Sequence, residues 1–182
     1  MKPKGFTIRI AGETDQQYAE EISDETERSA IARGSGISKR TPESIKEKMK
    51  DGKAVIALSE DGHWAGFSYI EVWAKGEYVS NSGLIVAPEY RKGGIASAIK
   101  RKIFALSRIK FPRAKIFSIT TGLAIMKLNA KLAFETVTFN ELPADKGFWE
   151  GCRSCVNYDI LHSKNFKNCL CTAMLYTPKK IR

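Results

Sequence analysis

A glycine-rich stretch between an apolar run and a basic helix pattern is the part of the sequence best suited to binding chemistry. It reads Arg91-Lys92-Gly93-Gly94-Ile95-Ala96 and directly follows the residues GLIVAPEY. The first turn of a helix carries unpaired N–H groups and the positive end of the helix dipole, so it attracts anions. Glycines lack the Cβ atoms that would block phosphate oxygens, although a tight turn alone also explains a glycine pair. We therefore predict a phosphate-binding loop at residues 91–96.

The spacing of this loop narrows the choice of anion. It matches neither G-x-x-x-x-G-K-[ST] nor G-x-G-x-x-G, so nucleoside triphosphates and dinucleotides are not indicated. The chain has 30 Lys and Arg against 20 Asp and Glu, a formal net charge of +10. Such a charge favours polyanionic partners, which include nucleic acid, phosphorylated cofactors and acidic small substrates.

The elements around the loop predict a mixed α+β fold. Asp-Gly and Lys-Gly turns separate β-rich runs into an antiparallel meander, and the period changes from strand to helix after Pro88. Lys100, Arg101 and Lys102 are expected largely outside the apolar face of the helix that follows. Strands are predicted at 5–11, 54–60, 64–74, 78–88, 114–121 and 135–142, and helices at 15–32, 42–50, 95–108 and 122–134.

Length and composition indicate one domain over residues 1–182, with a cysteine-containing segment at about 141–182. The chain is 43% hydrophobic and 27% charged, and no apolar run reaches the ~18 to 20 residues of a membrane-spanning helix. The first residues, MKPKGFTIRIAGETDQQ, lack the apolar core of a secretory signal. We expect a cytoplasmic protein that does not contact membranes.

The loop and its setting resemble the GNAT N-acyltransferases, whose acyl-CoA loop reads R/Q-x-x-G-x-G/A. Here Arg91, Gly94 and Ala96 occupy the specified positions after a meander and before a basic helix. The resemblance implies a GNAT-like, mostly antiparallel sheet flanked by helices, with acyl-CoA as co-substrate. It also implies that the backbone of Arg91, Lys92, Gly93, Gly94, Ile95 and Ala96 binds the pyrophosphate, and that Leu84, Ile85 and Val86 bind the pantetheine arm.

The sequence departs from the family at the residue that protonates the departing thiolate. The family pattern A-x-x-L-Y-x-K-L-G-F has a tyrosine there, whereas AIMKLNAKLAF has Asn129. An amide cannot serve as the acid, so Asn129 is expected either to contact the cofactor, or to cap the helix or face solvent. Tyr158 is an alternative phenol, and the general acid stays open.

A second resemblance covers nearly the whole chain. The stretches ARGSGISKRTPESIKEKM, NSGLIVAPEYRK, TTGLAIMKLN and FWEGCRSCVNYDIL are similar to small bacterial N-acylglutamate synthases of arginine biosynthesis. This implies transfer of an acetyl or succinyl group from CoA to the α-amine of L-glutamate. Arg33, Lys39 and Arg40 are candidates to bind its carboxylates, because arginine suits bidentate carboxylate recognition. A solvated basic turn explains the same residues.

The implied reaction needs a proton acceptor for the amine and donors for the developing oxyanion. A backbone N–H near Ile85 or Val86 is the candidate oxyanion donor. Glu71 lies inside a central strand pattern and is the candidate base, directly or through water, unless it is a surface glutamate. Ser80, Asn81 and Ser82 interrupt the facing strand and are candidates to orient the acceptor or the water.

All four cysteines fall in the C-terminal segment, as Cys152-x-x-Cys155 and Cys169-x-Cys171. Disulfides are disfavoured in the cytoplasm, and four thiolates can bind zinc tetrahedrally. Because C-x-C is an atypical ligand pair, we expect reduced thiols and no metal. Two other readings stay open. One is an acyltransferase acting on a protein lysine, a polyamine or an aminoglycoside; the other, less favoured, is a basic nucleic-acid-binding module using Trp149. A homodimer is possible.

Overall fold

Short turns pair the strands of the first half of the chain. The computed structural model describes residues 5–34 and 39–179, and within them β1 (Phe6–Ile10), β2 (Ala54–Ser59), β3 (Trp64–Trp73) and β4 (Tyr78–Val86) form antiparallel neighbours. The turn between β2 and β3 uses Gly62 at φ +81°, a backbone conformation that favours glycine. These strands are the predicted meander.

The second half of the chain extends this sheet with a crossover. The helix α3 (Ile95–Lys110) connects β4 to the parallel strand β5 (Lys115–Thr120). Strand β7 (Thr172–Tyr176) then lies between β5 and β6 (Glu135–Val137), antiparallel to both. The complete order is β1-β2-β3-β4-β5-β7-β6.

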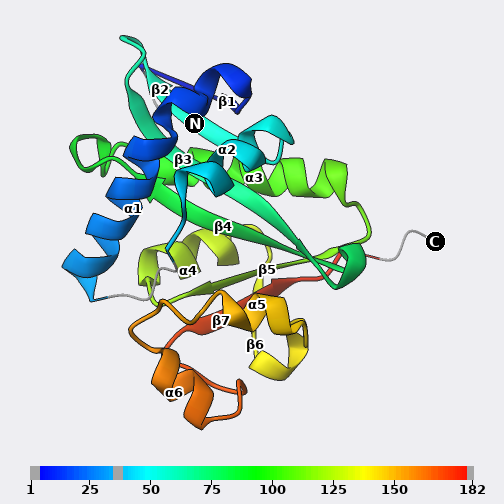
Figure 1. The fold of residues 1–182 in the computed structure, drawn as a ribbon. Coiled ribbons are helices and arrows are strands. Elements are labelled where there is room, and N and C mark those ends of the chain that lie inside the picture. Colours follow the sequence, from blue (N-terminus) through cyan, green and yellow to red (C-terminus); the bar gives the residue numbers. More distant parts are fainter. Residues whose placement is uncertain (1–4, 35–38, 180–182) are drawn as a thin grey trace.

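Helices cover both faces of the sheet (Figure 1). Thr41 caps α2 by accepting a hydrogen bond from the Ser44 N–H at 3.2 Å, and Pro42 occupies its first turn. A 3₁₀ turn at Glu13–Tyr18 leads into α1. The remaining helices are α1 (Ala19–Arg33), α2 (Pro42–Lys50), α4 (Leu123–Ala130), α5 (Lys146–Glu150) and α6 (Tyr158–Ser163).

Side chains alternate between the two faces of the sheet along each strand, and this divides the core into two layers. Val79 and Ile116 pack with Ile99 and Ile103 of α3 on one face, which α4 also covers. The opposite face packs Tyr69 against α1 and α2, and farther along it packs Phe117, Trp149 and Leu161. Thus α1 and α2 share a face with α5 and α6, and α3 and α4 lie behind it.

Strands β4 and β5 separate soon after they meet. Their pairing runs from Tyr78–Lys115 to Ser80–Phe117, although β4 continues to Val86 and β5 to Thr120. A bulge in β4 marks the separation, because Tyr69 faces Ser82 while Phe67 faces Ile85. Gly83 sits in this bulge at φ +62°, and a Cβ there would lie 2.4 Å from the Tyr69 ring. The sheet therefore has a gap between two neighbouring strands.

The predicted α+β class and mostly antiparallel sheet are confirmed, with local differences. Strand β6 ends at Val137, because Thr138 caps a 3₁₀ turn at Phe139–Glu141 through a reciprocal contact with Glu141. The sequence did not predict α5, α6 or β7. No helix of residues 5–34 and 39–179 has both the length and the apolar character needed to cross a membrane.

Candidate functional site

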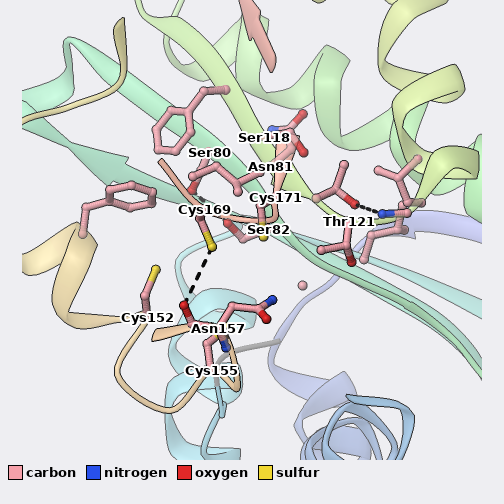
Figure 2. Close-up of a pocket in the computed structure, with 18 of the residues that line it drawn as sticks. Ser80, Asn81, Ser82, Ser118, Thr121, Cys152, Cys155, Asn157, Cys169 and Cys171 are labelled. Carbon is pink, nitrogen blue, oxygen red and sulfur yellow. Dashed lines mark hydrogen bonds between the residues drawn. The ribbon is translucent and has the colours of Figure 1, made fainter. Parts of the chain in front are cut away.

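A cavity of about 480 Å³ occupies the gap between β4 and β5 and continues toward the C-terminal segment (Figure 2). It passes from one face of the sheet to the other, so its lining divides into two sides. We call them the cysteine side, beneath α1, α2, α5 and α6, and the α3 side. The cysteine side includes Arg40, Ser80, Ser82, Cys152, Cys155, Tyr158, Cys169 and Cys171, and the α3 side includes Asn81, Leu84, Lys100 and Ser118.

Serine hydroxyls form the floor of the cysteine side. Ser80 Oγ accepts a hydrogen bond from Trp73 Nε1 at 3.1 Å and lies 2.8 Å from Ser82 Oγ. Of the predicted serine and asparagine group, Asn81 points to the other face, where its Nδ2 donates to Ser107 Oγ at 2.7 Å. Asn81 Oδ1 has no hydrogen-bond partner in the described part of the chain. The cavity therefore holds hydroxyls on one side and an unpaired amide oxygen on the other.

Four thiols also line the cavity: Cys169 and Cys171 lie near Ser80 and Ser82, and Cys152 and Cys155 lie farther from them (Figure 2). All four cysteines are free, and Cys169 Sγ lies 3.9 Å from the Asn157 carbonyl oxygen. Burial raises the pKa of Cys152 to about 11 and that of Cys171 to about 12, and the neighbouring cysteines add to both shifts. Across residues 5–34 and 39–179, no three or more His, Cys, Asp or Glu side chains are grouped to hold a metal ion.

Of the three predicted carboxylate-binding residues, Lys39 and Arg40 separate in the structure. Arg40 lines the cavity, donates its Nε–H to Tyr69 Oη and lies 5.7 Å from the centre of that ring. Lys39 instead pairs with Glu27 at 2.6 Å on the surface, and its backbone N–H donates to Ser154 Oγ at 3.0 Å. Arg33 ends α1, and its side chain lies outside the described part of the chain. Arg40 is thus the described member of the group that reaches the cavity.

The glycine loop begins α3 with two residues in the left-handed region. Lys92 has φ +69° and Gly94 has φ +82°, and nothing lies within 4 Å of a Cβ built on Gly94. The first bond of the helix runs from Ala98 N–H to Gly94 O at 3.1 Å, so the preceding N–H groups are not used inside the helix. The start of α3 therefore combines backbone N–H donors, open space at Gly94 and the positive end of the helix dipole, which together suit an anion.

The side chain of Arg91 stabilises this loop through contacts with α1 and with the end of β4. Its Nη2 lies 2.8 Å from both Glu25 Oε1 and Ser29 Oγ of α1, and its Nε donates to Val86 O at 3.1 Å. Ala87 N–H bonds to Ala65 O of β3. Because N–H directions alternate along a strand, the Val86 N–H points away from β3, toward the gap.

Several predicted residues lie outside the cavity lining: Val86 and the loop residues 91–96 are not part of it, and neither are Glu71 and Asn129. Glu71 forms an ion pair with Lys48 of α2 at 2.5 Å and does not line the cavity. Asn129 is fully buried and donates Nδ2–H to Met174 Sδ at 3.7 Å. Its Oδ1 has no hydrogen-bond partner in the described part of the chain, and Asn129, like Glu71, is absent from the cavity lining. Solvent exposure, one of the expectations for Asn129, is therefore wrong, because α4 packs this residue against β7.

Lys100 lines the cavity, but the sequence placed it outside the apolar face of its helix. The residue is 1% exposed, and its Nζ lies 5.1 Å from the centre of the Phe134 ring. Burial lowers the pKa of Lys100 to about 7. A spacing signal was present, because Lys100 precedes Ile103 by three residues and Ser107 by seven, and both are buried. The adjacent basic residues Arg101 and Lys102 obscured it.

Comparison with solved structures identifies the fold. No family model matches the sequence, and no curated protein matches it either. N-acetylglutamate synthase from Neisseria gonorrhoeae, complexed with coenzyme A and N-acetyl-glutamate, superposes with a TM-score of 0.66 at 17% identity, covering 98% of this chain. A GNAT superfamily phosphinothricin acetyltransferase from Sinorhizobium meliloti with acetyl-CoA gives 0.65 at 16% identity, covering 98% of this chain and 92% of its own. The chain has the GNAT fold.

A further structural match comes from Mycobacterium tuberculosis. The protein Rv2747, in complex with CoA, gives a TM-score of 0.66 at 18% identity and covers 94% of this chain and 98% of its own. This chain spans only 36% of the Neisseria synthase. These likenesses establish the GNAT fold, and activity has to be inferred from the site.

Proposed function

We propose that the chain is an acyl-CoA-dependent N-acyltransferase whose acceptor is an amino acid, L-glutamate in particular. One observation carries this proposal: a single cavity joins the gap between β4 and β5 to Arg40, and no carboxylate lines it in the described part of the chain. An acceptor with its own negative charge fits such a lining, whereas a polycation does not.

The donor half of the proposal rests on the loop and on β4. Backbone N–H groups at residues 93–96 would bind the CoA diphosphate, with Gly94 leaving space for its oxygens. The unpaired edge of β4 at Leu84–Val86 would bind the pantetheine arm where β4 and β5 part. The unpaired Asn81 Oδ1 would accept a hydrogen bond from the same arm. The thioester would then lie in the gap, with the Val86 N–H as a candidate oxyanion donor.

The acceptor half rests on the cysteine side. Arg40 would bind a carboxylate through the guanidinium N–H groups that Tyr69 and the Lys39 carbonyl leave free. Ser80 and Ser82 would orient the amine or a water that removes its proton. Glu71 would serve as the base only through water, because Lys48 holds its carboxylate outside the cavity lining.

The neighbours add support for glutamate. The Neisseria synthase was solved with N-acetyl-glutamate, and the sequence itself resembles small N-acylglutamate synthases. We therefore also propose a role in arginine biosynthesis, in the cytoplasm. The acceptors kept as alternatives are a protein lysine, a polyamine and an aminoglycoside.

A donor and acceptor panel tests the proposal. Acetyl-CoA and succinyl-CoA are each incubated with glutamate, glutamine, ornithine, spermidine and a lysine peptide, and release of the CoA thiol is followed. We expect rapid thiol release with glutamate as the acceptor and much slower thiol release when spermidine replaces it. Equal rates with the cationic acceptors would exclude the acidic-acceptor proposal, and absence of CoA binding by calorimetry would exclude the acyltransferase.

A further inference from the structure

Lys100 is a buried cation whose charge no described residue balances. It is 1% exposed, and no ion pair or hydrogen bond of its Nζ occurs among residues 5–34 and 39–179. A buried ammonium without a partner is strongly disfavoured and tends to lose its proton, and lysine is almost never fully buried unless it is paired. Its surroundings are an aromatic ring, that of Phe134, and the open volume of the cavity. Any partner for the charged form of Lys100 would therefore come from what the cavity binds.

The position of Lys100 along α3 indicates which part of the ligand it meets. It follows Gly94 by six residues, which is a rise of ~9 Å along the helix from the diphosphate end. On the same side of the cavity lie Leu84 of β4 and Ile125 of α4, next to the gap. An arm that enters from the loop along β4 would bring its thioester sulfur to this region. This step rests on the CoA site of the proposed function.

The other titratable groups of the cavity are poorly suited to protonate that sulfur. Strands β4 and β5 and helix α4 contribute no titratable side chain to the lining. Arg40 cannot release a proton, and the raised pKa values of Cys152 and Cys171 make them weaker acids than an ordinary thiol. Cys155, Cys169 and Tyr158 come from the C-terminal segment and line the cysteine side. They are therefore not on the α3 side, where Lys100 lies.

We propose that Lys100 is the catalytic acid of the transfer and protonates the departing CoA thiolate. The neutral amine of the acceptor attacks the thioester carbonyl and forms the C–N bond. As the tetrahedral intermediate collapses, the C–S bond breaks and its electron pair goes to sulfur. The Lys100 ammonium gives one proton to that sulfur and becomes a neutral amine. The proton lost by the acceptor nitrogen passes to solvent, and Lys100 regains a proton from solvent.

The acidity of Lys100 suits this transfer. Burial lowers its pKa to about 7, whereas an ordinary thiol has a pKa of ~8.5. Proton transfer from this ammonium to a thiolate is therefore downhill, and it would be uphill from an ordinary lysine with a pKa of ~10.4. Near neutral pH a substantial fraction of Lys100 is charged and ready to donate.

Free CoA is a probe of this contact that needs no acceptor. A nearby ammonium stabilises a thiolate, so the thiolate absorbance of CoA bound to the wild type should appear at lower pH than in Lys100→Met. We expect a separation of at least about one pH unit. Lys102→Met, an exposed lysine on the same helix, is the matched control and should titrate as the wild type does. Coincident titrations of wild type and Lys100→Met would overturn the inference.

Kinetics then separate proton donation from charge alone. Lys100→Met should lower kcat by about 10² to 10⁴ with little change in the KM for acyl-CoA. The wild-type rate should fall as pH rises above about 7, because the acid loses its proton, and this limb should vanish in the variant. Lys100→Arg keeps the charge but cannot donate, so it should keep the early thiolate absorbance and lose kcat. Full activity of Lys100→Arg would exclude proton donation.

The outcomes distinguish this inference from the proposed function. If calorimetry finds no CoA binding to the wild type, the acyltransferase proposal fails first. If CoA binds but its thiolate titrates at the same pH in the wild type and in Lys100→Met, only the inference about Lys100 fails. Methionine has a similar length and no charge, so folding should survive, and thermal unfolding checks it. Should Lys100→Met not fold, Lys100→Arg still decides through its kcat.

Discussion

Arg91 Nη2 and Glu25 Oε1 lie 2.8 Å apart, and this ion pair joins the glycine loop to helix α1. The Glu25 side chain is only 6% exposed, whereas Arg91 is 43% exposed. Arg91 also donates to the Val86 carbonyl at the end of β4. One guanidinium therefore ties together three elements around the predicted diphosphate site, so we interpret it as a residue that shapes the loop.

Replacing this guanidinium should weaken cofactor binding. Arg91→Ala removes charge-assisted hydrogen bonds worth about 1.5 to 3 kcal/mol each before solvent screening, and leaves Glu25 with the Ser29 hydroxyl and with Arg28 at 3.3 Å. We expect a roughly ten-fold rise in the Kd for CoA and a loss of about 1 to 2 kcal/mol in the free energy of unfolding. Calorimetry and urea unfolding measure the two effects. Arg113→Ala, at an exposed turn, should change neither.

Gly94→Glu should abolish CoA binding, because it places bulk and negative charge where the diphosphate is expected. Gly62→Glu is a matched control, since Gly62 has φ +81° against +82° for Gly94 and equally open surroundings. Each variant should lose about 1 to 2 kcal/mol through left-handed backbone strain. Only the loop variant should lose CoA in calorimetry. Unchanged CoA affinity in a folded Gly94→Glu would move the cofactor site elsewhere.

Arg40→Ala should raise the KM for glutamate ten-fold or more, because one charge-assisted carboxylate contact is lost. The Kd for CoA should stay nearly the same, since the loop is untouched. Lys39→Ala serves as the neighbouring control, because Lys39 pairs with Glu27 on the surface and should leave the kinetics unchanged. Equal effects of the two substitutions would show that the carboxylate site is not at Arg40.

Alkaline pH should destabilise the protein through its cavity thiols. Burial raises the folded pKa values of Cys152 to about 11 and Cys171 to about 12, against ~8.5 for an unfolded thiol. Their contribution is thus fully present below pH ~8.5 and is lost as pH rises toward 11 to 12, where unfolding releases protons. The double variant Cys152→Ala and Cys171→Ala should show a shallower decline in the free energy of unfolding. Parallel declines would contradict the raised values.

The sequence predicted best those features that depend on neighbouring residues. Asp-Gly and Lys-Gly turns fixed the meander, and Gly94 together with the basic helix located the loop. Strand β7 was missed because its pairing with β5 joins residues far apart in the chain, and no local pattern reports such a pairing. The short helices α5 and α6 lie among turns and lack a long apolar period.

The candidate site was only partly predictable for the same reason. The cavity brings Arg40, Ser80 and Cys171 together from three separate regions, and the sequence proposed only Arg40 and Ser80 as binding residues. The sequence did not predict that Lys100 is buried, because a run of basic residues is usually a solvated helix face. Only its packing against Phe134 distinguishes Lys100 from Arg101. The binding and catalytic roles assigned to these residues stay predictions until the variants are measured.

The position of β7 in the sheet has a consequence for synthesis on the ribosome. In the described sheet, β6 pairs with β7 alone, and β7 also completes the edge of β5. Residues 138–171 separate β6 from β7 in the chain, so both edges stay unpaired while that segment is made. Unpaired edges invite pairing with other chains. The nascent chain is therefore most exposed to misassembly just before Thr172–Tyr176 emerges, and the cysteine side of the cavity closes only then.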